Sequence, residues 1–86
     1  MASIEEVRAG IDGAKEKASE SLGALQQAQS ALEEAQAQMQ QVTEGSGQAD
    51  VSEANAMLAQ AVTSITEVQQ NVQAAIEASE NVAARL

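Results

Sequence analysis

Hydrophobic residues recur every three or four positions along two stretches of this chain. With Ile4 at position a of a seven-residue repeat, the a and d positions of the first stretch are apolar except for Ser21. The same repeat started at Val51 leaves Ser79 as the one polar residue at a or d in the second stretch. None of the 17 charged residues falls on these positions. Spacings of three and four predict helices that pack along one stripe, whereas strands would alternate with a period of two.

Helix-start and turn signals lie at the ends of the two stretches. Ser3 and Glu6, and likewise Asp50 and Glu53, have the spacing of a capping box, in which each side chain satisfies a free backbone amide. A cluster of glycine and polar residues lies between the stretches. We therefore expect one all-α domain over residues 1–86, with helices at about 4–43 and about 51–85 and a turn at about 44–50.

An antiparallel arrangement of the two helices places large side chains opposite small ones. When residue i faces residue 93 − i, Met39 meets Ala54, Ala35 meets Leu58 and Leu32 meets Ala61. Such alternation lets two helices approach closely and specifies their register. The sequence thus predicts an antiparallel two-helix coiled-coil hairpin.

Apart from Met1, four large hydrophobic residues lie outside the predicted a and d seam. Leu22, Val62 and Ile76 occupy e positions, and Met57 occupies a g position. The two e edges of an antiparallel pair lie on the same side of it. Straight helices drift relative to a 3.5-residue repeat, so these residues could simply widen the seam. Alternatively they form an exposed strip that binds a second hairpin. We expect the second case, a homodimer with a four-helix bundle in which these four residues mediate self-association.

Composition excludes most kinds of chemistry. The chain has no Cys, His, Phe, Tyr or Trp, so it cannot form a Cys/His zinc site or a histidine-based relay. The carboxylate groupings, such as Glu33 with Glu34 and Asp12 with Glu16, all avoid the seam and are expected on solvated faces. We predict a protein that is not an enzyme, with no catalytic, cofactor-binding or metal-binding residues.

Charge limits the partners. The net charge is −9, and residues 18–84 hold nine acids and no base, which disfavours nucleic acid and anionic membrane surfaces. No apolar run approaches the roughly 18 residues of a membrane span, so stable membrane insertion is not expected. Acids stand where a signal peptide carries basic residues, which indicates a cytoplasmic protein or one exported without a cleavable signal peptide.

Three glycines, Gly10, Gly13 and Gly23, interrupt the first helix at a cost of up to about 1 kcal/mol each relative to alanine. Gly10-Ile11-Asp12-Gly13 lacks the basic residue and preceding strand of a phosphate loop. The glycines therefore indicate either local fraying of the helix or close approach of a partner helix, and we expect fraying.

The layout of two equal helices around Gly45-Ser46-Gly47 resembles the WXG-type hairpins of actinobacterial type VII secretion systems. The chain lacks that family's Trp-x-Gly turn, and Asn81-Val82-Ala83-Ala84-Arg85-Leu86 lacks its Tyr-containing export motif. The segments Ser3–Arg8, Glu44–Gly47 and Ala83–Leu86 also resemble short uncharacterised actinomycete helical-hairpin proteins. The first resemblance implies leaderless secretion, and the second implies no activity.

These observations predict a non-enzymatic helical-hairpin interaction or structural protein whose partner is itself or another helical chain. Leaderless secretion as a WXG-like hairpin is the specific alternative. Binding to a lipid surface is less well supported, because the apolar strip is narrow and lacks Trp, Phe and flanking Lys.

Overall fold

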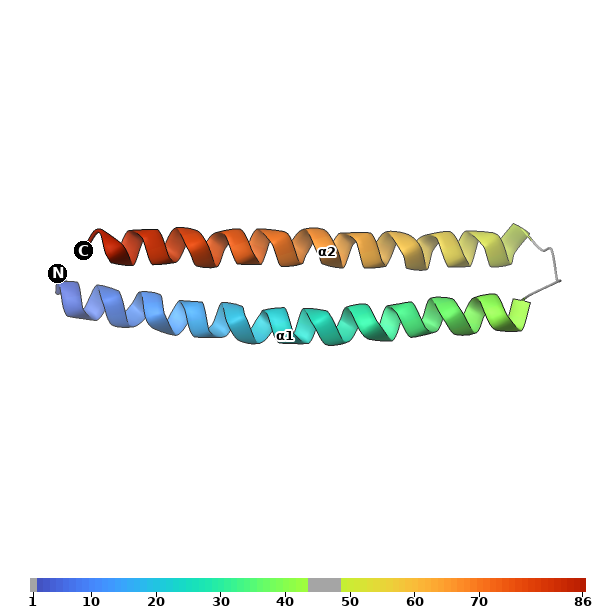
Figure 1. Ribbon diagram of the computed structural model, residues 1–86, viewed down its shortest axis with the longest axis horizontal. Coiled ribbons are helices and arrows are strands. Elements are labelled where there is room, and N and C mark those ends of the chain that lie inside the picture. Colours follow the sequence, from blue (N-terminus) through green and yellow to red (C-terminus); the bar gives the residue numbers. More distant parts are fainter. Residues whose placement is uncertain (1, 44–48) are drawn as a thin grey trace.

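The computed structural model describes residues 2–43 and 49–86. It contains two helices, α1 (Ile4–Thr43) and α2 (Ala49–Ala84), and the described residues include no strand. The helices run side by side in opposite directions, with the two chain termini at the same end of the pair (Figure 1). The prediction of an all-α helical hairpin is confirmed.

The helix boundaries agree closely with the predicted ranges. α1 has the expected bounds, whereas α2 starts at Ala49 and so includes Asp50, which we had expected to precede it. The centre of the predicted turn, residues 44–48, lies outside the described residues. At the start of α1 the backbone amide of Glu6 donates to Ser3 Oγ at 3.1 Å, and the amide of Val7 donates to the Ser3 carbonyl at 3.0 Å. Ser3 is therefore the predicted N-cap of this helix.

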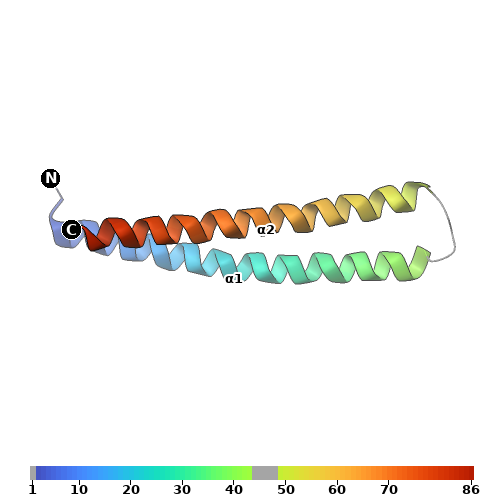
Figure 2. The same cartoon turned by 45° about the horizontal axis from the view of Figure 1, so that its top comes forward.

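The hairpin is a single layer of two long helices, 64 × 18 × 15 Å across the described chain (Figure 2). Such a shape leaves almost no interior. Among the described residues Ile76 is the one buried hydrophobic side chain, with 8% of its surface exposed, and no polar side chain is buried to that degree. Most of the contact between α1 and α2 is consequently made by half-buried residues.

These half-buried residues show which faces of the helices meet. They recur at alternating spacings of four and three residues, as a seven-residue repeat requires. They occupy the a and e positions, however, and not the a and d positions over most of the length. In α1 they are Ile11, Lys15, Ala18, Leu22, Leu25, Gln29, Leu32, Gln36 and Met39. In α2 they are Val51, Asn55, Leu58, Val62, Ile65, Gln69, Val72, Ser79 and Ala83, and the buried Ile76 continues the same series. Thr66, at a b position, is also half-buried.

The burial pattern indicates the relative height of the two helices. When the half-buried a and e positions of α1 and α2 are paired in order, we infer residue numbers that add to 94, from Met39 with Asn55 to Ile11 with Ala83, where the predicted sum was 93. An ion pair between Lys15 Nζ and Glu80 Oε1, 3.9 Å apart, joins the helices at a matching height. The burial pattern therefore shows that the predicted a and d seam was wrong about the rotation of each helix about its own axis.

Side-chain size gives the physical reason for this rotation. The d positions away from the turn are mostly small, as at Ala14, Ala28 and Ala75, and these residues are exposed. Rotation toward e brings Leu22 and Ile76 into the seam in their place, and larger side chains remove more apolar surface from water. Closer to the turn some d positions remain half-buried, namely Ala35, Ala54 and Ala61.

Candidate functional site

The four residues predicted to mediate self-association do not lie on one exposed strip. Ile76 is buried between the helices, Leu22 and Val62 are half-buried there, and Met57 is 63% exposed. The patch expected at Leu22 and Ile76 is therefore absent from the hairpin surface, because the seam itself covers these residues. Of the two interpretations of the e positions, a widened seam describes the single chain.

The exposed apolar surface lies beside the seam, along the d and g positions, and not along the predicted e positions. Among the described residues seven large hydrophobic side chains are exposed, and none of them occupies a b, c, e or f position. Two are a residues at the open end of the hairpin, Ile4 and Leu86. The other five occupy d or g positions: Val7, Val42, Met57, Val68 and Val82.

The d and g positions of both helices form one continuous face. In an antiparallel pair the corresponding edges of the two helices share one side, as the e edges do. Small residues fill much of the space between the five large ones, at Ala14, Ala24, Ala28, Ala31, Ala75 and Ala78, all of which are exposed. We call the exposed d and g positions of α1 and α2 the open face.

The open face differs from the rest of the surface in charge. Every acidic residue from Glu5 to Glu34 and from Glu53 to Glu80 occupies a b, c or f position. Apart from Asp50, which stands at g in the first turn of α2 and whose side chain lies outside the described residues, the d and g positions of α1 and α2 carry Lys17 as their one charged residue, and Arg85 follows at the next g position. Most of the negative charge thus lies on the other faces of the hairpin. Hydrophobic and small side chains predominate on the open face, with Ser21, Gln38, Ser64 and Asn71 as neutral polar residues, so protein can cover it at a lower desolvation cost than the faces that carry carboxylates.

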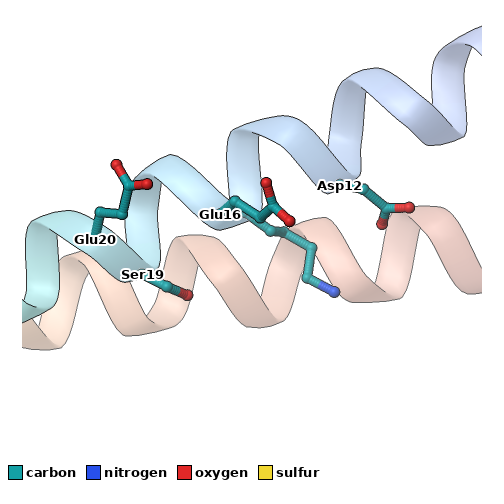
Figure 3. A pocket seen from close by; sticks show the side chains of 5 residues that line it. Asp12, Glu16, Ser19 and Glu20 are labelled. Atoms are coloured by element: carbon teal, nitrogen blue, oxygen red, sulfur yellow. The ribbon is translucent and has the colours of Figure 1, made fainter.

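The other side of the hairpin is polar. Asp12, Lys15, Glu16, Ser19 and Glu20 line a wide, shallow depression on α1. The four of these that Figure 3 labels are spread along the helix and do not converge on one point. Among the described residues no group of three acidic side chains is placed to hold a metal ion. The carboxylates therefore form a solvated surface in the described part of the chain.

The hydroxyls of Ser21, Thr63, Thr66 and Ser79 donate to backbone carbonyls of their own helix. Ser21 Oγ donates to the Ala18 carbonyl at 2.7 Å, and Ser79 Oγ donates to the Ala75 carbonyl at 2.8 Å. These are the two serines of the predicted seam, and such local bonds satisfy a hydroxyl without a partner chain. Neither hydroxyl is positioned as an activated nucleophile, because no basic side chain accepts its proton.

The three glycines of α1 are not required for packing within the hairpin. A Cβ added to Gly10, Gly13 or Gly23 would have no neighbouring atom within 4 Å. Close approach of α2 therefore does not explain them, and the cost of each glycine falls on the stability of α1.

The open face was missed at the sequence level, although the sequence carried a signal for it. Both the d and the e positions have apolar residues, and the larger side chains of α1 beyond the first turn stand at e. A comparison of the side-chain volumes at d and e would have predicted an a and e seam, with Val7, Val68 and Val82 exposed.

Comparison with known proteins adds no relative. No family model matches the chain, and neither the curated proteins nor the solved structures give a significant match. Within the described residues, neither helix has an apolar stretch long enough to cross a lipid bilayer. The class of this protein therefore follows from its architecture, a helical hairpin with one apolar face.

Proposed function

We propose that this chain is a non-enzymatic interaction protein, a two-helix coiled-coil hairpin that self-associates into a four-helix bundle. The proposal rests on the solvent-accessible surface area of the single hairpin. Its accessible surface is 6227 Å², whereas a compact monomer of 8.9 kDa exposes about 4,800 Å². The hairpin thus exposes roughly 1,400 Å² more than a compact protein of its mass.

The excess surface is large enough for a stable interface between two copies. A protein interface of standard size buries about 800 Å² on each partner. The open face offers apolar side chains from both helices, and packing two such faces together would give each hairpin the core that it lacks alone. Carboxylates at b, c and f positions would remain in water, so association need not bury the negative charge.

Light scattering coupled to size-exclusion chromatography tests self-association directly. We expect a mass close to twice the 8.9 kDa of one chain at high micromolar concentration, with dissociation on dilution. A mass of one chain at high micromolar concentration would contradict self-association and would leave a different helical protein as the partner of the open face.

A matched pair of variants tests whether the open face is used. Val68→Asp places a charge on the open face, where Val68 is 44% exposed, and Gln70→Asp places the same charge two residues away at an f position. We expect Val68→Asp to weaken the dimer at least about 100-fold, because each dimer would bury two unpaired carboxylates. Gln70→Asp should change the dissociation constant only a few-fold. Equal effects of the two variants would exclude the open face as the interface.

A further inference from the structure

Charge is distributed unevenly along the length of the hairpin. All four basic residues, Arg8, Lys15, Lys17 and Arg85, lie toward the end that carries the termini. Residues 25–69, the half that contains the turn, hold six acids and no base. The remaining residues hold seven acids and four bases, so the two halves have net charges of −6 and −3.

Two hairpins can bring their open faces together in two symmetric ways. In the first way the turns lie at the same end, so the halves with net charge −6 face each other. In the second way the turn of one copy lies over the termini of the other, so each −6 half faces a −3 half. The hairpin is 64 Å long and the Debye length is about 8 Å at physiological ionic strength, so repulsion between directly facing halves dominates. Charge favours the second, head-to-tail arrangement.

The open face has a register that fits the head-to-tail arrangement. In it α1 packs on α1 of the second copy, and α2 packs on α2. If residue i of α1 faces residue 49 − i, the exposed Val7 meets Val42 of the second copy. The 94-sum pairing within each hairpin then makes residue j of α2 face residue 139 − j, which brings Met57 to Val82 of the second copy. One register thus pairs large exposed residues on both helices.

The middle of the same register is made of small residues. Ala14 faces Ala35, Ser21 faces Ala28, and Ala24 lies next to its own counterpart at the centre. Small side chains at successive layers allow two helix backbones to approach closely. Lys17 of one copy lies within about one helical turn of Glu34 of the second, and Arg85 lies similarly close to Glu53.

We propose that the open face binds a second copy of this chain head to tail, about a two-fold axis perpendicular to the helices near Ala24. This inference rests on the proposed self-association and adds its face, direction and register. The occupant is a second copy because the surface that one hairpin leaves exposed is large enough for a dimer interface, and because one register pairs Val7 with Val42 and Met57 with Val82 between two copies.

Single-cysteine variants of the full chain, treated with a short bifunctional maleimide, test this arrangement. Ala24→Cys should cross-link to itself in high yield, because two copies of residue 24 approach each other only when α1 packs on α1. Ser30→Cys, at an exposed f position of the same helix, is the matched control and should remain largely uncross-linked. Equimolar mixtures of two variants distinguish the head-to-tail arrangement from the arrangement with both turns at the same end. Val7→Cys with Val42→Cys should form mixed dimers, whereas Ala14→Cys with Ala78→Cys would do so only when the turns lie at the same end.

The outcomes separate this inference from the proposed function. Efficient cross-linking of Ala24→Cys, at least about ten times that of Ser30→Cys, together with Val7–Val42 mixed dimers would support the head-to-tail interface. Light scattering of each unreacted variant must show whether it is still dimeric. A dimer in which Ala14→Cys cross-links to Ala78→Cys would overturn the head-to-tail direction. A dimer in which neither pair of variants cross-links would overturn the open face as the interface. A parent chain that is monomeric would overturn the proposed function itself.

Discussion

Ile76 gives the sharpest test of the seam between α1 and α2. It is 8% exposed, and the half-buried pairs place it opposite Ala18. Shortening this side chain should therefore destabilise the hairpin. The seam predicted from a and d positions would have left Ile76 outside, so its substitution would then have had little effect on the fold of one chain.

The expected loss of unfolding free energy follows from the number of carbon atoms removed from Ile76. Ile76→Val deletes one methylene equivalent, worth about 0.8 kcal/mol, and Ile76→Ala deletes three, worth roughly 2 kcal/mol after correction for residual exposure. Truncation in a closed core also leaves a cavity and costs up to about 5 kcal/mol. The neighbours of Ile76 are only half-buried, so they can close over the gap, and we expect values near the transfer term alone.

Urea unfolding followed by circular dichroism at 222 nm measures these differences. The series should be recorded at several protein concentrations, because a change within the hairpin lowers the unfolding free energy per chain at every concentration. Gln70→Ala, at an exposed f position, is the control and should change stability by less than about 0.5 kcal/mol. If Ile76→Ala cost no more than Gln70→Ala, or if Val and Ala at position 76 were equivalent, the a and e seam would be refuted.

Four further predictions concern single features of the helices. Gly13→Ala and Gly23→Ala should each raise the unfolding free energy by about 1 kcal/mol in thermal melts, because an added Cβ meets nothing; a lower melting temperature would contradict this. Ser3→Ala should cost about 1 kcal/mol by removing the 3.1 Å cap, and retention of full stability would show that the cap is not used. Asn55→Leu should stabilise the seam by about 1 kcal/mol or more in urea unfolding, since Asn55 Oδ1 is buried without a hydrogen-bond partner; destabilisation would reveal an unseen one. Helicity at low ionic strength should hold or rise from pH 7 to pH 5 as the −9 net charge decreases toward the pI of about 4.1, and a cooperative loss of helix would indicate stabilising carboxylate contacts.

The sequence by itself determined the two helices and their hairpin arrangement. The three-four spacing, the Ser3 cap and the absence of charge from one stripe are local signals, and each depends on residues within a few turns of one another. They sufficed to predict α1 from Ile4 to Thr43 and a second helix of nearly the observed length, running back along the first.

Only the tertiary structure decided how far each helix is rotated about its axis. The heptad spacing is the same for an a and d seam and for an a and e seam, so periodicity cannot distinguish them. The choice depends on all layers of both helices together, where Leu22, Val62 and Ile76 at e outweigh alanines at d. The aliphatic parts of half-buried Gln29 and Gln36 add to the same side. This rotation of about one heptad position moved the predicted association strip into the seam and left Val68 and Val82 on the face available to a partner.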